Sequence, residues 1–242
     1  MKRLCPARLA ILAVILIATA GCGPAIGEEA RAVPAPKLDS PLAAQHGKQT
    51  AVLAGGCFWG LQWMFEHVKG VTNVTSGYSG GRASTAQYER VSEGDTGHAE
   101  SVRIEFDPAQ VSYGQLLRVY FSVATDPTQL NRQGPDTGTQ YRGVIFYSNP
   151  QQEKIARAYI AQLGEAKTFD APIVTQVVKF DAFYPAEQYH QDYARIHPDE
   201  PYIAINDAPK VARLQQLLPQ LYRAQPLIWH SGASGAIAVN VL

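Results

Sequence analysis

The chain has 242 residues with 21 basic and 21 acidic side chains, so its formal net charge at pH 7 is zero. This balance gives no electrostatic basis for binding nucleic acid, which attracts basic proteins through its phosphates. Hydrophobic residues make up 46% of the sequence, an ordinary share for a globular protein with a buried core, and the length suits one domain with appended segments.

The first 22 residues predict a signal for export. A basic opening is followed by an uncharged apolar run from Leu9 to Ala20, which is too short to span a bilayer comfortably and ends in small residues. The run leads through Thr19 to Cys22, similar to a bacterial lipoprotein signal whose cysteine is acylated, although that pattern prefers Leu in place of Thr19. We expect location in the periplasm or cell envelope, with lipidation at Cys22. The alternative is an incidental cysteine near an ordinary cleavage site.

The rest of the chain divides into three parts. Residues 23–49 are rich in Gly, Pro, Ala, Glu and Lys without a periodic apolar face, which predicts a flexible linker. Residues 50–223 carry the patterns of a folded domain. Residues 224–242 form an apolar, Gly- and Ala-containing tail to which the sequence assigns no role.

Apolar patterns in the domain predict a mixed order of strands and helices. Strands are expected over residues 50–54, 71–78, 99–106, 141–147 and 173–180. Helices are expected over residues 58–68, 112–123, 149–163 and much of 185–196, with long loops over 80–96 and 126–138. The order β-α-β-β-α-β, then α-β, resembles the split βαβ plait. We therefore expect an α+β, ferredoxin-like fold with additional helices and long loops.

Cys57 follows the first predicted strand in the sequence Gly-Gly-Cys-Phe-Trp-Gly. A thiol between a strand and a helix meets unpaired amides and the positive end of the helix dipole, which both favour the thiolate. We therefore expect a thiol that is nucleophilic near neutral pH. The alternative is a buried cysteine that packs as a small apolar side chain. Because Cys5 and Cys22 lie in the predicted signal, the domain has no partner for an internal structural disulfide.

Glu100 opens the third predicted strand, where the alternation places it on the same face as Val102 and Ile104. A carboxyl that points inward among apolar groups is desolvated, so its pKa rises and it can hold a proton near pH 7. The alternative is a carboxylate at the edge that points to water, as most glutamates do. We expect no metal site, because the histidines lack close pairing and no Cys-x-x-Cys is present.

The segment around Cys57 resembles the active-site segment of the A-type peptide methionine sulfoxide reductases, which reduce the S epimer of methionine sulfoxide. Further motifs continue the resemblance in the family's order, over about residues 50–210: Ser-Gly-Tyr-Ser-Gly-Gly at 76–81, Gly-Asp-Thr-Gly-His-Ala-Glu at 94–100, Gln-Gly-Pro-Asp-Thr-Gly-Thr-Gln-Tyr-Arg at 133–142 and Gln-Tyr-His-Gln at 188–191. The resemblance implies thiol-dependent reduction of methionine-S-sulfoxide, free and in proteins, through a Cys57 sulfenic acid. In an exported chain this would repair oxidised exported proteins.

The resemblance also implies roles for particular side chains. Cys57 matches the family's nucleophile and Glu100 its proton donor. The phenols of Tyr88 and Tyr141 match two groups that hydrogen-bond the sulfoxide oxygen and so stabilise developing charge.

Three further positions are expected to surround the substrate. Phe58 and Trp59 are expected to form the apolar wall for the substrate methyl group, whereas Trp63 and Phe65 are expected in the core. Asp136 matches a family acid near the site, with an Asx-turn as its structural alternative.

The resemblance implies no bound cofactor and an external thiol reductant, either a thioredoxin-like protein or a small thiol. Many relatives carry a resolving cysteine after the nucleophile, and this chain has none beyond Cys57. We expect a monomer that acts on oxidised-methionine proteins. The chain departs from the family at Thr125, where His is usual, and at Gly143, where Ser is usual.

Two other functions remain open from the residues alone. One is a cysteine hydrolase that uses Cys57 with His98 or His190 as its base, although His190 also matches a family residue without an assigned step. The other is a lipoprotein that only binds oxidised methionine segments.

Overall fold

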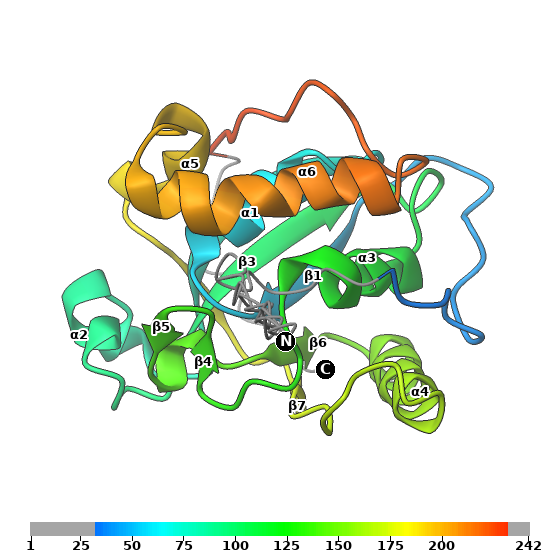
Figure 1. The fold of residues 1–242 in the computed structure, drawn as a ribbon, viewed down its shortest axis with the longest axis horizontal. Helices are drawn as coiled ribbons and strands as arrows, with labels where there is room; N and C mark the ends of the chain where they lie inside the picture. The colour runs from blue at the N-terminus through cyan, green and yellow to red at the C-terminus, as the bar shows by residue number, and fades with distance from the viewer. Residues whose placement is uncertain (1–31, 232–242) are drawn as a thin grey trace, which may run out of the picture.

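A six-stranded mixed sheet forms the centre of the computed structural model, which describes residues 32–231 (Figure 1). The strand order is β7-β6-β1-β3-β2-β8, with β1 (Gln49–Ala54), β2 (Val71–Ser79), β3 (Ala99–Phe106), β6 (Val144–Tyr147), β7 (Gln176–Lys179) and β8 (Phe183–Pro185). Neighbouring strands are antiparallel except for β6 and β7, which are parallel. The short strands β4 (Arg132–Gln133) and β5 (Asp136–Thr137) form a separate hairpin.

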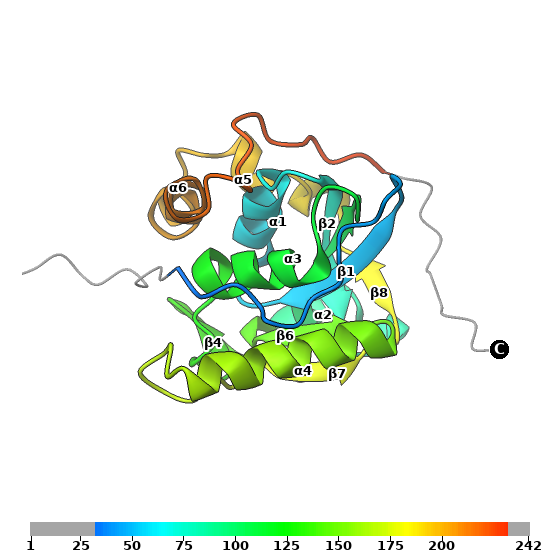
Figure 2. The same ribbon diagram turned by 90° about the vertical axis from the view of Figure 1, so that its right-hand side faces the viewer.

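The main core lies between one face of the sheet and three helices, α1 (Phe58–Glu66), α3 (Tyr113–Val119) and α4 (Pro150–Glu165). The fourth long helix, α6 (Ala208–Leu217), packs beside α1, as both ribbon views show (Figure 2). Two shorter helices, α2 (Tyr88–Ser92) and α5 (Tyr193–Ile196), lie in the connections. A smaller apolar cluster that includes Val52, Val144 and Phe183 covers part of the opposite sheet face. In residues 32–231 no helix has the length and apolar character needed to cross a membrane.

The ends of the helices follow their local sequence. The Ser112 hydroxyl and the Gln115 side chain form a reciprocal capping box at the start of α3. The Asn149 side chain caps α4, and Pro150 occupies the first turn, where a missing N–H costs nothing. Gly56 lies two residues before α1 and has φ of +100°, a backbone conformation that residues with a side chain rarely adopt.

The five predicted strands are confirmed as β1, β2, β3, β6 and β7, with two of them shorter than expected. A 3-10 turn at Thr139–Tyr141 delays the start of β6, and β7 is limited to Gln176–Lys179. The helix predicted over much of 185–196 is confirmed in part, as a 3-10 turn at Gln188–His190 and the four residues of α5. Asp192, with φ of +58°, separates the two. The sequence interpretation also missed β8, the β4–β5 hairpin and α6.

The described part of the segment before β1, residues 32–48, is held against the domain, contrary to the flexible linker expected there. Val33 is 1% exposed in the main core. The Tyr159 hydroxyl donates to the Pro34 carbonyl at 2.6 Å. Asp39 accepts hydrogen bonds from the Gly114 amide at 2.8 Å and from the Ser112 hydroxyl, which ties this segment to the start of α3. The predicted signal, Cys22 included, lies outside the described residues.

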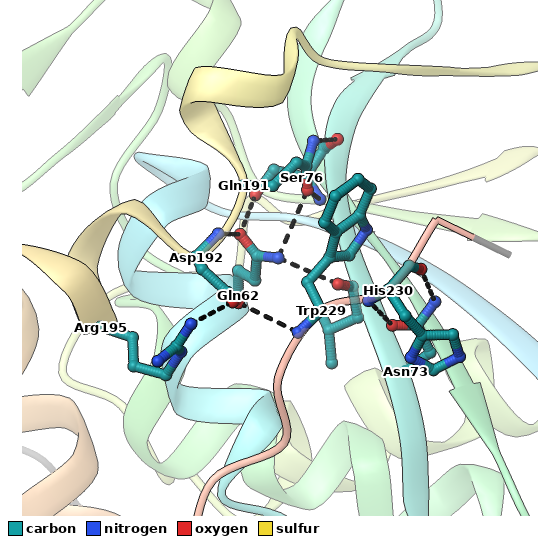
Figure 3. A network of polar contacts seen from close by, with 9 residues as sticks. Gln62, Asn73, Ser76, Gln191, Asp192, Arg195, Trp229 and His230 are labelled. Atoms are coloured by element: carbon teal, nitrogen blue, oxygen red, sulfur yellow. Dashed lines mark hydrogen bonds and ion pairs between the residues drawn. The ribbon is translucent and has the colours of Figure 1, made fainter.

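The first part of the predicted tail also contacts the domain (Figure 3). The Trp229 amide donates to Asp192 at 3.3 Å, and the Trp229 indole N–H donates to the Thr75 hydroxyl at 3.3 Å. Asn73 of β2 donates to the His230 carbonyl at 3.2 Å. The Leu227 amide donates to the Glu66 carbonyl at 3.1 Å, so residues 224–231 run from the end of α1 to β2. Residues 232–242 lie outside the described part of the chain.

We predict that Asp39→Ala lowers the free energy of unfolding by about 1–3 kcal/mol, because the variant removes a charged acceptor from two donors. Urea denaturation would measure this change. Asp199→Ala is the control, since Asp199 is exposed and its removal should change stability by less than about 0.5 kcal/mol. Equal effects of the two substitutions would show that the segment before β1 contributes nothing specific to stability.

Candidate active site

Cys57 occupies the junction between β1 and α1, as the sequence predicts. It is the N-cap residue of α1, is 8% exposed and is the one free cysteine in residues 32–231. A Cβ at Gly56 would lie 2.6 Å from the Gln133 side chain, so the approach to the cysteine has room only for glycine. The thiol is thus held in a fixed and largely dry position.

Glu100 lies beside Cys57 and points into the protein, which excludes the solvent-exposed alternative. It is 2% exposed, and its Oε2 accepts a hydrogen bond from the Phe58 amide at 3.0 Å. Burial raises the pKa of Glu100 to about 8, with further increases from the charges of Asp136 and Asp207, while the Phe58 hydrogen bond opposes the rise. Glu100 therefore holds a proton at neutral pH, as expected.

The pKa of Cys57 is opposite to the sequence prediction. Burial, followed by the charge of Glu100, raises this pKa well above the usual thiol range, and a hydrogen bond from the Trp59 backbone only partly opposes the effect. The prediction considered the start of the helix but not the loss of water around the sulfur. In the resting protein the thiol is protonated, so any reaction requires that its proton be removed when substrate arrives.

The phenols of Tyr88 and Tyr141 belong to the same site. Both side chains are half-buried, and burial raises the pKa of each, followed by the negative charge of Glu100. The charge of Cys57 acts on both phenols as well. The two hydroxyl groups are therefore protonated donors close to the thiol and to Glu100.

Asp136 anchors a contact across the site instead of forming an isolated Asx-turn. Its Oδ2 accepts a hydrogen bond from the Tyr202 hydroxyl at 2.5 Å. Burial raises the pKa of Asp136, while this hydrogen bond and the charge of Lys210 oppose the rise. The sequence interpretation missed Tyr202 because it placed no element between residues 197 and 223. The helix pattern of 208–217, which has Pro209 in its first turn, was the available signal.

Phe58 and Trp59 form an aromatic wall next to the cysteine. The Trp59 ring stacks on Tyr193 with ring centroids 4.0 Å apart, and its indole N–H donates to His190 Nδ1 at 3.1 Å. Phe58 is fully buried and its ring lies 5.1 Å from the His190 ring. Phe65 is also buried in the core, as predicted, whereas Trp63 is only half-buried.

The two candidate bases of a cysteine hydrolase are engaged elsewhere. His98 Nδ1 accepts from the Gly81 amide at 3.2 Å, and His98 Nε2 contacts the Arg82 carbonyl at 3.0 Å. His190 Nδ1 accepts from Trp59, and burial lowers the pKa of His190, which keeps the ring neutral. Since neither ring is hydrogen-bonded to Cys57 in the described residues, the geometry disfavours this rival function.

The two departures from the family pattern affect packing near the site. The Thr125 hydroxyl donates to the Gln133 side chain, and a Cβ at Gly55 would lie 2.9 Å from Thr125. A Cβ at Gly143 would lie 3.1 Å from the Thr175 hydroxyl, so glycine relieves a tight contact there. Over residues 32–231, no group of three or more His, Cys, Asp or Glu side chains is arranged to hold a metal ion.

Comparison with known proteins gives consistent matches over the domain. The family model described as "Peptide methionine sulfoxide reductase" matches residues 49–221. A Mesorhizobium japonicum protein named peptide methionine sulfoxide reductase MsrA 2 is 58% identical over 185 residues, which cover 76% of this chain and 95% of that protein. A protein of the same name from a Synechocystis strain is 52% identical over 197 residues, covering 81% of this chain and 92% of that protein.

Two solved structures are also similar. Methionine sulfoxide reductase A of Corynebacterium diphtheriae has a TM-score of 0.54 and 32% identity, with 72% of this chain and 91% of that chain covered. The reduced form of Mxr1 from Saccharomyces cerevisiae has a TM-score of 0.57 and 30% identity, with 68% and 92% covered.

We predict that Glu100→Gln moves the pH midpoint of Cys57 alkylation by iodoacetamide downward by about one unit or more. The carboxylate of Glu100 raises the pKa of Cys57, so removal of that charge makes the thiolate available at lower pH. Glu93→Gln is the matched control, because Glu93 lies on the surface and pairs with Arg90. A midpoint that stays in place or moves upward would show that Glu100 does not act on the thiol.

Proposed function

Because this chain belongs to the peptide methionine sulfoxide reductase family and is therefore an oxidoreductase acting on methionine sulfoxide, we propose that Cys57 and Glu100 carry its chemistry. The observation that carries the proposal is a buried thiol next to a carboxyl that is protonated at neutral pH. A binding protein requires neither group. We further propose that the S epimer of the sulfoxide is the substrate, free or in proteins.

In the proposed reaction the Cys57 sulfur attacks the sulfur of the sulfoxide while Glu100 protonates the sulfoxide oxygen. The thiol proton passes to the Glu100 carboxylate, so the carboxyl ends the step with the proton it began with. The oxygen is transferred to Cys57, which becomes a sulfenic acid. The cysteine sulfur thus loses two electrons, and the methionine sulfur gains two.

The other site residues are proposed to hold the sulfoxide during this step. Tyr88 and Tyr141 donate hydrogen bonds to its oxygen, where negative charge develops before protonation. Phe58 and Trp59 contact the methyl group. Asp136, held by Tyr202, fixes the loop that carries Tyr141. The high pKa of the resting thiol limits side reactions until substrate is bound.

Regeneration is proposed to use an external thiol, without any bound cofactor. Cys57 is the only cysteine in the sequence beyond residue 22, so the domain has no second thiol for an internal disulfide. A first reductant thiol condenses with the sulfenic acid and releases water, which leaves a mixed disulfide. A second thiol then releases Cys57. We propose a thioredoxin-like protein or a small thiol as this reductant.

Two finer proposals concern the fold and the location. We propose that the core is a ferredoxin-like split βαβ plait, supported by the order β6-β1-β3-β2, in which β3 lies antiparallel between β1 and β2. From the sequence pattern before Cys22 we propose an exported monomer, lipid-anchored at Cys22, that repairs oxidised proteins of the periplasm or cell envelope.

We predict that Cys57→Ser reduces turnover to below about 1% of wild type, a loss of at least about 2.7 kcal/mol of transition-state stabilisation. The assay follows both sulfoxide epimers of a blocked methionine with dithiothreitol present, and only the S epimer should be consumed by the wild type. Cys22→Ser is the control and should keep full turnover. Higher residual activity in Cys57→Ser, or turnover of the R epimer alone, would contradict the proposal.

We predict that one equivalent of substrate, added without reductant, makes Cys57 reactive toward dimedone, because the sulfenic acid has no resolving thiol. Mass spectrometry of the mature protein would locate the adduct. A disulfide between Cys22 and Cys57 in place of the adduct would mean that the chain resolves its own sulfenic acid.

A further inference from the structure

A buried ion pair lies next to the active site, in a segment for which the mechanism above has no use. Asp207 ends the π-helical turn η5 (Ile203–Asp207), and Lys210 lies in the first turn of α6. Asp207 is 0% exposed and Lys210 is 6% exposed. The Lys210 ammonium donates to Asp207 Oδ1 at 2.9 Å.

The ion pair packs directly against the helix that Cys57 begins. A Cβ at Gly60 would lie 1.9 Å from Asp207 Oδ1 and 3.0 Å from Lys210 Nζ. Gly60 is three residues after Cys57, in the first turn of α1, so any other residue there would displace the pair. The last glycine of the segment around Cys57 is therefore explained by the space that Asp207 and Lys210 occupy.

The charge of Asp207 acts on the groups that carry the chemistry. It contributes to the raised pKa of Cys57 and to that of Glu100. It acts in the same direction on Asp136, where the charge of Lys210 opposes it. The ion pair and the reacting groups thus share one poorly solvated region, in which charges interact more strongly than in water.

Stability alone gives a weak reason for this arrangement. Burying two charges costs several kcal/mol per ion, and well-packed apolar residues of similar size often replace such pairs without loss. Asp207 Oδ2 in addition has no hydrogen-bond partner within residues 32–231. An incompletely satisfied buried carboxylate beside a catalytic cysteine calls for an explanation in terms of the reaction.

We propose that Asp207 and Lys210 are positioning residues whose opposed charges set the electrostatic field at Cys57 and Glu100, and with it the pH range of the chemical step. This inference rests on the proposed function. The charge of Asp207 acts on four titratable groups: Cys57, Glu100, Asp136 and Tyr202. Two further titratable groups, Tyr120 of the π-helical turn η2 (Tyr120–Ala124) and Glu66 at the end of α1, belong to elements that contact α6.

The test is the pH profile of single-turnover Cys57 oxidation, measured for the wild type, Asp207→Asn and Lys210→Met. The high-pH limb reports loss of the Glu100 proton. Asp207→Asn removes a negative charge and should move that limb downward by about one pH unit. Lys210→Met leaves Asp207 uncompensated and should move it upward. Lys210→Arg keeps the charge and should restore the wild-type position.

A purely structural role would not give opposite shifts. Limbs that move in the same direction, or that do not move in folded variants, would overturn the proposal. If the single variants do not fold, the exchanged pair Asp207→Lys/Lys210→Asp keeps both charges but reverses their positions. Its limb should move downward, because the negative charge that acts on Glu100 is replaced by a positive one. A limb identical to the wild type would likewise overturn the proposal.

Alkylation of Cys57 in the same variants needs no substrate and should shift in the same two directions. This measurement separates the two proposals. Opposed alkylation shifts without sulfoxide reduction by the wild type would refute the proposed function alone, whereas normal wild-type reduction without shifts would refute this inference alone.

Discussion

The site depends on the hydrogen bond that joins the Phe58 amide to the Glu100 carboxyl. It connects the start of α1 to β3, one of the two central strands of the sheet, so the nucleophile and the acid come from two elements fixed to each other. Burial raises the pKa of both groups, and the charge of Glu100 raises the pKa of Cys57 further. Three features lie around this contact: the aromatic wall of Phe58 and Trp59, the phenols of Tyr88 and Tyr141, and the ion pair that packs against Gly60.

Burial accounts for the difference between the expected and the observed thiol. The end of a helix dipole contributes about 0.3–1 kcal/mol, whereas desolvation shifts buried groups by up to about 3–5 pKa units, each equivalent to about 1.4 kcal/mol. The larger effect decides the resting state of Cys57. A sequence indicates where a helix begins, but it contains no direct measure of how much water remains at that point.

Much of the fold and of the site was predictable because the signals are local. A short apolar run identified β1, and the alternation of apolar residues identified β3 and placed Glu100 on its inner face. The resemblance supplied the positions of Tyr88, Tyr141 and Asp136. Two departures from the prediction lack such signals: β8 has only three residues, and the left-handed Asp192 interrupts the helix expected over 185–196. Tyr202, Asp207 and Lys210 reach the site only through long-range packing of α6 beside α1.

The docking of residues 33–46 on the domain bears on the proposed anchor at Cys22, because it limits how far the domain could lie from a membrane. With a linker that extended to residue 49, a chain acylated at Cys22 would reach up to about 90 Å at about 3.3–3.6 Å per residue. Because Val33 is buried in the core, only residues 23–33 would separate an acylated Cys22 from the folded domain. The fully extended length of these residues is about 40 Å. A tether of this length would confine the domain to the region next to the membrane, so its substrates would be proteins that lie close to that surface.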